Sequence, residues 1–326
     1  MSALVAMLRS SRTIGVRPLH SMSMMMATKL VKPFPVPSRV QEVHDRHGWA
    51  KMEFKASEEE LAQIDRYVVD RVATEHPGNV VDDEGRLRAV HGYDQGWNPS
   101  LMNRLASRAL SFLDCDSVYV YQFRVNIKTP SKTAGSWSLH RDFDFWHGMD
   151  GMPTTNAIAF HILVSEHTNT NGPVIFVDGS HRVGVEADAK DSKDWKSGFG
   201  ESTLKYTLPE ELIGEQPCTP MTGSQGTVAS MDPLTWHYSS PNTESNNRVL
   251  FSVIFNDITN LPVQPEGTSP RPHYIVSQPT ERNIWKRASA FGSQSAVGKT
   301  NILEDQRVNC LRPLTSPAMV RPSQYP

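Results

Sequence analysis

Two polar residues near the middle of the chain, His140 and Asp142, have the types and the spacing of metal ligands. On an extended segment, residues i and i+2 point to the same side, so the imidazole and the carboxylate can reach one ion. With 12 histidines in the chain, about 0.6 His-x-Asp pairs are expected by chance at average Asp usage. The pair therefore gains meaning only from its context, a short Ser/Thr/Gly loop that follows a segment of alternating residues.

A mononuclear iron site of the two-histidine, one-carboxylate type needs a second histidine and leaves coordination positions open. His237 fits this role best, because it follows one strand-like segment and precedes Arg248, which opens the next. An α-keto acid that chelates the iron needs a bidentate partner for its far carboxylate, and a guanidinium at the start of a neighbouring strand supplies one. Four other downstream histidines fit less well. His161, in an apolar strand, is predicted to be a satisfied core residue, and His147 follows a tryptophan too closely to bind the same ion without a tight reversal of the chain. His167 and His181 lie in polar turns.

Two amphipathic helices are predicted before this pair, and both stripes most simply face the core. Residues 57–72 open with a capping box, Ser57 with Glu60 three residues later. The apolar stripe of this helix is Leu61, Ile64, Val68 and Val72. Residues 99–113 begin with a proline, as helices often do. Their stripe is Leu101, Leu105, Ala109 and Leu113.

From about residue 117 the hydrophobic period changes from 3.6 to 2. In residues 118–128, apolar and polar residues alternate: Tyr121, Phe123, Val125 and Ile127 with Gln122, Arg124, Asn126 and Lys128. Taken alone, the polar face indicates the solvated side of a strand. Further strands are predicted within residues 157–164, 172–179, 226–231 and 248–255. Helices followed by many short strands predict a mainly β fold with flanking helices and a double-stranded β-helix (jelly roll, cupin-like) core.

The composition excludes two classes of partner. Lysine and arginine total 33 against 35 acids, a net charge of −2, so the positive field that nucleic acid requires is not expected. No apolar run approaches the roughly 20 residues that cross a bilayer. The three widely spaced cysteines, Cys115, Cys218 and Cys310, fit neither a disulfide framework nor a zinc clasp and favour a reducing compartment. The sequence leaves the oligomeric state open, with a homodimer among the options.

The first 40 residues contain six basic residues and no acid. This composition, with several serines and no long apolar stretch, is typical of a mitochondrial transit peptide. The alternative is an arm in front of a cytoplasmic protein. A start at one of four later methionines would discard most of the signal: Met22, Met24, Met25 or Met26. The predicted division is a transit peptide and proline-marked linker at 1–38, a single domain at 39–291 and a C-terminal tail at 292–326.

A family resemblance is carried by three runs, LHRDFDFWHGMDGMP, NGPVIFVDGSH and TWHYSSPN, followed by Arg248. These runs resemble the phytanoyl-CoA dioxygenase family of non-haem iron(II), 2-oxoglutarate-dependent dioxygenases, and within it they look most like the ectoine hydroxylases. The resemblance covers most of residues 115–275, including RPHYI near its end. It implies Fe(II) as cofactor, 2-oxoglutarate and O2 as cosubstrates, and ascorbate as a supporting reductant.

Carried over by position, the resemblance implies that iron is held by His140, Asp142 and His237. The implied 2-oxoglutarate contacts, with the first as clamp of the distal carboxylate, are Arg248, Asn126, Lys128, Ser239 and Trp137. The implied substrate contacts are Gln122, Trp146 and Ser252. The polar face of residues 118–128 would then line the site instead of facing solvent. Ordinary core packing is the alternative for both tryptophans.

Several departures from the ectoine hydroxylase pattern leave the substrate open. Arg141, Asp144 and Phe145 stand where that pattern has Ser, Glu and Thr, and HYSSPN replaces HGSNGN after the second iron histidine. Ser252 replaces an aromatic that packs on the substrate ring, a contact worth on the order of 1 kcal/mol or more. We predict hydroxylation of an unactivated C–H bond in a small polar metabolite, ectoine-like or amino-acid-like, with release of succinate and CO2. The alternatives are hydroxylation of another metabolite such as an acyl-CoA, and a catalytically silent metal-binding β-barrel.

Overall fold

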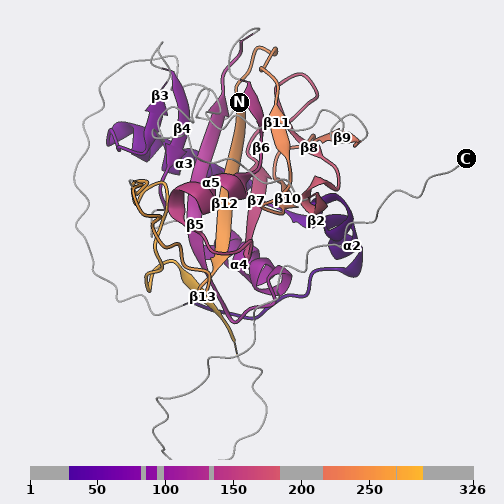
Figure 1. The fold of residues 1–326 in the computed structure, drawn as a ribbon. Helices are drawn as coiled ribbons and strands as arrows, with labels where there is room; N and C mark the ends of the chain where they lie inside the picture. Colours follow the sequence, from indigo (N-terminus) through magenta and orange to yellow (C-terminus); the bar gives the residue numbers. More distant parts are fainter. Residues whose placement is uncertain are drawn as a thin grey trace, which may run out of the picture. The chain divides into compact units, whose positions relative to one another are not determined.

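The computed structural model describes residues 29–81, 86–93, 99–131, 136–183, 216–268 and 270–288. Within them, the larger of two β-sheets has nine strands in the order β1, β13, β5, β12, β7, β10 and β2, and a hairpin of β3 and β4 pairs with β5 (Figure 1). The strands are β1 (Lys29–Val31), β2 (Trp49–Lys55), β3 (Asn79–Val81), β4 (Leu87–His91), β5 (Ser117–Lys128), β7 (Ala157–Leu163), β10 (Thr227–Met231), β12 (Arg248–Asp257) and β13 (Ile284–Arg287).

The smaller sheet has four strands in the described residues, in the order β6, β11, β8 and β9. Their bounds are β6 (Trp137–His140), β8 (Val174–Val177), β9 (Cys218–Pro220) and β11 (His237–Ser239). The helices are α2 (Ser38–His47), α3 (Glu58–Ala73), α4 (Pro99–Phe112) and α5 (Asp142–Asp150). The predicted class, mainly β with flanking helices around a jelly-roll core, is confirmed.

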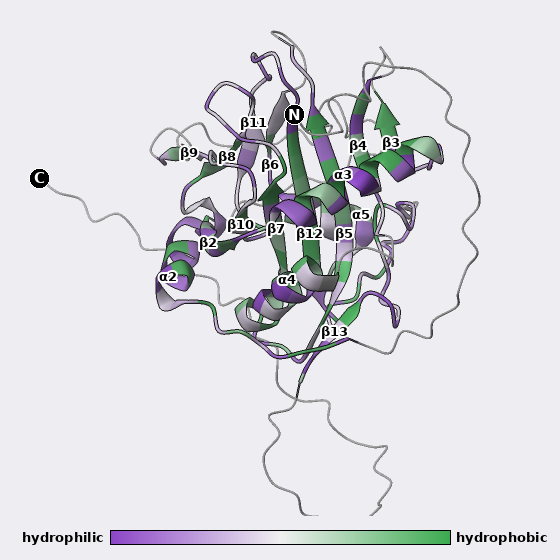
Figure 2. Cartoon of the chain, turned by 180° about the vertical axis from the view of Figure 1, so that it is seen from behind, coloured by the Kyte–Doolittle hydropathy of each residue, from purple (hydrophilic) through white to green (hydrophobic). Residues whose placement is uncertain are grey.

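Two apolar clusters fill the fold on either side of the large sheet. The outer cluster packs Ile64 of α3 and Leu105 of α4 against residues of β5 and β12, including Phe251. The inner cluster lies between the two sheets and joins Phe176 of β8 to Leu163 of β7. Both faces of the central strands are therefore buried, and β12 is largely green in Figure 2. The inner face carries the polar exceptions that build the site.

Both predicted helices are present. In α3, Ser57 accepts from the Glu60 backbone N–H and the Glu60 carboxylate accepts from the Ser57 N–H, so the predicted capping box is confirmed. The assignment of Val72 to the core is wrong, because it lies in the last turn and is 44% exposed. In α4 the predicted stripe is buried through Ala109, whereas Leu113 lies beyond the helix end and is partly buried.

The predicted alternation of β5 holds except at a β-bulge. Gln122 pairs with Ile254 of β12, but the next pair joins Val120 to Phe255, so Tyr121 is an extra residue. Its side chain therefore belongs to the inner cluster, not to the outer face with Phe123 as predicted. The bulge turns two consecutive side chains of β5 toward the inside.

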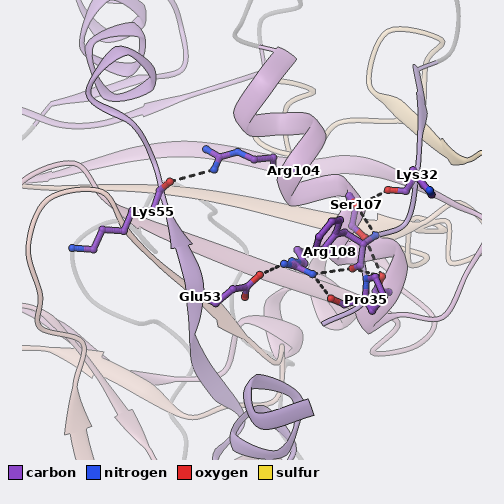
Figure 3. Close-up of polar contacts among 9 residues, drawn as sticks. Lys32, Pro35, Glu53, Lys55, Arg104, Ser107 and Arg108 are labelled. Carbon is purple, nitrogen blue, oxygen red and sulfur yellow. Dashed lines mark hydrogen bonds and ion pairs between the residues drawn. The ribbon is translucent and has the colours of Figure 1, made fainter. Parts of the chain in front are cut away.

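Residues 29–37, which belong to the segment 1–38 predicted to be transit peptide and linker, contact the core. Strand β1 pairs in parallel with β13. Ser107 of α4 donates to the carbonyl of Lys32 and accepts from the Phe34 N–H, both at 2.8 Å. Arg108 donates to the carbonyls of Phe34 and Pro35 and forms an ion pair with Glu53 (Figure 3). Residues 29–37 are thus attached to the folded domain.

The predictions for residues 1–28 and for the tail at 292–326 lie outside the described residues. Among the helices that the structure does describe, none has the length and apolar character needed to cross a membrane.

Candidate active site

The three predicted iron ligands lie together. His140 ends β6 and His237 begins β11, and the two residues are paired across these antiparallel strands, with ring centroids 4.2 Å apart. Asp142 is the first residue of α5, and its Oδ1 lies 3.8 Å from His140 Nε2 and 3.9 Å from His237 Nε2. One ligand atom from each residue falls within 4.8 Å of the others. Strand pairing thus supplies the histidine that the local His-x-Asp spacing could not.

Backbone carbonyls orient both imidazoles. His140 Nδ1 lies 2.7 Å from the Ser138 carbonyl, and His237 Nδ1 lies 2.9 Å from the Thr235 carbonyl. Nδ1 must carry the proton to donate there, which leaves the Nε2 lone pair for a metal. Burial lowers the pKa of His140 to about 3 and also lowers that of His237, so both rings are neutral near pH 7.

The carboxylate is held ionised by a nearby cation. Burial raises the pKa of Asp142, but Arg124, whose Nη2 lies 3.6 Å from Oδ2, leads the opposing effects that bring it to about 2. Oδ1 faces the two imidazoles, whereas the buried Oδ2 has no hydrogen-bond partner among the described residues. Two neutral imidazole nitrogens and one anionic oxygen on one side of a point are the donor set that a non-haem iron(II) ion takes, with the remaining positions open. The residues present fit iron.

Arg248 is a buried cation that pairs with no anion among the residues that the structure describes. It begins β12, is 3% exposed, and its Nε and Nη1 have no hydrogen-bond partner in the described part of the chain. Burial lowers the pKa of Arg248 to about 9. Because an unpaired buried charge is costly, such an arrangement favours an anionic ligand, and a planar fork suits a carboxylate. This is the environment expected of the predicted 2-oxoglutarate clamp.

Lys128 lies beside this guanidinium. It pairs with Arg248 in the register of β5 and β12, and its Nζ donates to Ser239 Oγ at 2.6 Å and to the Ser240 carbonyl. Burial, followed by the charge of Arg248, lowers the pKa of Lys128 to about 6. Asn126 lies two residues earlier on the same face of β5, and Trp137 pairs with Ser239 across β6 and β11; both are partly buried. The structure therefore gathers the five predicted cosubstrate residues, and their individual roles stay predictions.

The predicted substrate residues Gln122 and Trp146 contact each other. With its amide oxygen turned toward them, Gln122 accepts from Trp146 Nε1 at 3.3 Å and from Arg271 Nη2 at 2.9 Å. Arg271 Nε also donates to Asp150 Oδ1 at 2.8 Å, and Asp150 accepts from the Tyr121 hydroxyl. The sequence reasoning assigned no role to Arg271 or Asp150, although both stand in quoted runs, RPHYI and DGMP. This buried network connects β5 to α5 and holds the two predicted substrate residues together.

Ser252, the third predicted substrate residue, has an unexpected partner. Its Oγ lies 2.8 Å from His161 Nδ1, and in the sheet Ser252 stands between Arg124 and His161. His161 is buried as predicted, but its Nε2 has no partner in the described chain, so the expectation of a satisfied core histidine is wrong. Burial lowers the pKa of His161 to about 3, which makes the ring neutral. Position 252, where the ectoine hydroxylase pattern has an aromatic, is therefore part of a polar pair.

The other residues that bore on the interpretation fall into place. Phe145 lies edge-on to the His140 ring at 5.8 Å, beside the metal position. The three rejected histidines bind backbone carbonyls at Met152, Val249 and Asp45; they are His147, His167 and His181. Arg141 and Asp144, which were read as two separate departures, are paired with each other.

Comparison with known proteins agrees with this geometry. The family model for phytanoyl-CoA dioxygenase (PhyH) matches residues 25–249. An L-proline trans-4-hydroxylase from Streptomyces griseoviridis is 31% identical over 72% of this chain and 90% of its own. An ectoine dioxygenase from Bordetella bronchiseptica is 32% identical over 54% of this chain and 58% of its own length. The crystal structure of EctD from S. alaskensis with bound Fe is 25% identical, with a TM-score of 0.60 over 78% of this chain and 88% of that chain.

Proposed function

The chain belongs to the phytanoyl-CoA dioxygenase family, and we propose that it is an iron(II)- and 2-oxoglutarate-dependent dioxygenase that hydroxylates a C–H bond of a small zwitterionic metabolite. The single observation that carries the reaction type is the convergence of His140, Asp142 and His237, together with the buried guanidinium of Arg248, whose Nε and Nη1 have no hydrogen-bond partner among the described residues. A metal triad and an anion-binding arginine in one interior are what α-keto acid chemistry requires.

The balanced reaction is substrate R–H plus 2-oxoglutarate plus O2, giving R–OH, succinate and CO2. When bound, iron supplies the activation of dioxygen. His140, Asp142 and His237 would hold the iron, and three protein ligands would leave coordination positions for the cosubstrates. Arg248 orients 2-oxoglutarate through its distal carboxylate, and the inner apolar cluster around Leu163 and Phe176 excludes water from the interior.

Two features favour a small zwitterion as the substrate. The inner face of β5 presents polar and charged groups, Gln122 and Arg124, instead of a hydrocarbon surface. The relatives are named for L-proline and ectoine, both small zwitterions. Of these two, L-proline is the better first candidate, because the polar Ser252–His161 pair replaces the aromatic wall expected for an ectoine ring. An acyl-CoA substrate has only the family name in its support.

The test is a substrate panel with purified protein, Fe(II), 2-oxoglutarate and ascorbate. L-proline, other free amino acids, ectoine and phytanoyl-CoA are offered separately, and both succinate and the oxygenated product are measured. We expect succinate and hydroxylated product in equal amounts with at least one small zwitterion, and neither with the Asp142→Ala variant. Turnover of the acyl-CoA alone would replace the substrate proposal, and no coupled turnover with any compound would favour the catalytically silent alternative.

We also propose that the protein is targeted to mitochondria, supported by the six basic residues and absence of acids in residues 1–40. Fusing residues 1–28 to a fluorescent reporter tests this, and a diffuse cytoplasmic signal would contradict it. A homodimer is a further proposal, to be tested by light scattering during gel filtration.

A further inference from the structure

A buried cluster lies behind the metal ligands, formed by Arg141, Asp144 and Trp236. Arg141 donates to both carboxylate oxygens of Asp144, at 2.9 and 2.8 Å, and its guanidinium carbon lies 5.0 Å from the centre of the Trp236 ring. The three residues are 5%, 6% and 2% exposed, respectively. Such a planar, doubly bonded guanidinium on an indole face is a rigid contact, and lysine cannot reproduce it.

The chain position of these residues connects them to the metal site. Arg141 separates His140 from Asp142, and Trp236 directly precedes His237. Arg141 has extended backbone angles, φ −112° and ψ 138°, so its side chain points away from those of its two neighbours. The ligands therefore meet on one side of the two segments, while Arg141 and Trp236 meet on the other.

Each segment is also attached to its surroundings. The Trp236 N–H donates to Ser180 Oγ at 2.9 Å, and the Trp236 carbonyl accepts from Val177 of β8 at 2.9 Å. The Phe143 N–H at the start of α5 donates to the Pro233 carbonyl at 3.1 Å. The ligand-bearing segments are thus joined at the back by side chains and backbone, independently of any ion at the front.

We propose that the Arg141–Asp144–Trp236 cluster is a brace that sets the separation of the two ligand-bearing segments, and that Arg141 is a positioning residue for the metal. The inference rests on the proposed function. Buried ion pairs seldom add net stability over apolar replacements, so the contribution of this one is assigned to the geometry that it fixes. It also joins two departures from the ectoine hydroxylase pattern, at positions 141 and 144, into one paired change.

The test compares Arg141→Lys with Arg108→Lys. Arg108 is a matched control because it is also buried, forms an ion pair with Glu53 and lies over the Phe34 ring at 4.6 Å. It differs in its position, because it lies on α4 (Figure 3). The dissociation constants of Fe(II) and Zn(II) are measured without oxygen, together with the melting temperature of the metal-free protein. We expect Arg141→Lys to weaken metal binding about tenfold or more, and Arg108→Lys to change it less than twofold even where the melting temperature falls as much.

A second readout is the visible charge-transfer band that Fe(II) and 2-oxoglutarate produce when they bind together. It should need more Fe(II) in Arg141→Lys and should recover its full intensity at saturation. Metal affinity within twofold of wild type in Arg141→Lys, or an equal loss in Arg108→Lys, would overturn the brace. If Arg141→Lys does not fold, the near-isosteric Asp144→Asn replaces it with the same expectation. A wild-type protein that binds Zn(II) but gives no band with Fe(II) and 2-oxoglutarate would contradict the proposed function. In that case the Zn(II) affinities of wild type, Arg141→Lys and Arg108→Lys would still test the proposed brace.

Discussion

Removing the charge of Arg248 should stabilise the ligand-free protein while abolishing cosubstrate binding. Two of its guanidinium nitrogens are buried without partners among the described residues, and burial lowers the pKa of Arg248 to about 9, so the folded protein bears the cost of a desolvated cation. Replacing a buried ion pair by apolar side chains of similar volume often gains about 1–4 kcal/mol, and removing a buried charge that no described anion compensates should gain a similar amount. For a domain of this size, each kcal/mol corresponds to roughly 2–4 °C. We therefore expect Arg248→Met to raise the melting temperature by at least about 2 °C.

The same variant should lose the response to 2-oxoglutarate. Two charge-assisted hydrogen bonds to a carboxylate are worth at least about 3 kcal/mol, which is a loss of over about 100-fold in affinity. The assay is thermal denaturation with Zn(II) in place of iron, with and without 2-oxoglutarate, because a ligand that binds only the folded state raises the melting temperature. Wild type should shift upward with 2-oxoglutarate, and Arg248→Met should not.

Arg271→Met is the matched control. The Arg271 side chain is only 12% exposed, but Asp150 accepts two of its hydrogen bonds. Removing it strands a buried carboxylate, which typically costs about 3–5 kcal/mol. The two arginine variants should therefore move the melting temperature in opposite directions. A lower melting temperature for Arg248→Met, or an undiminished shift with 2-oxoglutarate, would refute the interpretation of Arg248 as a cation kept unpaired for a ligand.

Four further outcomes are expected. Alanine at any one metal ligand should abolish coupled succinate release, and substantial turnover in a single variant would remove that residue from the ligand set of His140, Asp142 and His237. Burial lowers the pKa of Lys128 from its ordinary 10.5 to about 6, so above pH 6 the ligand-free protein must take up a proton at Lys128 to pair with 2-oxoglutarate. The KM for 2-oxoglutarate should therefore rise with pH in that range. In Lys128→Met the KM should not change with pH. Deleting residues 1–28 should leave the melting temperature unchanged, whereas deleting residues 1–37 should lower it by several degrees, because Arg108 and Ser107 lose their partners. Equal melting temperatures would show that residues 29–37 are dispensable for stability. Ser252→Phe should raise turnover of ectoine relative to L-proline, measured as the ratio of kcat/KM values, and a fall in that ratio would count against a substrate-facing position.

The parts of the site that could be predicted from sequence depend on short-range geometry. The two-residue spacing of His140 and Asp142 and the alternation in β5 follow from backbone periodicity alone. His237 is distant from this pair in the sequence, and the pairing of β6 with β11 brings it next to His140. Its role therefore does not follow from local spacing. The capping box of α3 was equally local.

The features that the sequence did not reveal depend on contacts between distant segments. The bulge at Tyr121 exists because β5 must match the register of β12, and nothing local to β5 specifies it. Strand β1 has three residues, and its partner β13 lies more than 250 positions away, so no periodic pattern could indicate it. His161 meets its partner Ser252 through the pairing of β7 with β12, which local sequence does not indicate.

The division of labour between the two sheets has a consequence for substrate choice. Both predicted iron histidines lie on the small sheet and the predicted carboxylate ligand lies on α5, whereas the residues expected to contact substrate and cosubstrate lie mainly on the large sheet. Position 252 can therefore exchange an aromatic for a serine without moving a metal ligand, since Ser252 contacts His161 of the same sheet. Changes at 141 and 144 act on the opposite side, behind the ligands, and pair with each other. The departure at position 252 thus lies on a different sheet from the two predicted iron histidines, so this chain can share the chemistry proposed for it with its relatives while differing from them in the compound that it hydroxylates.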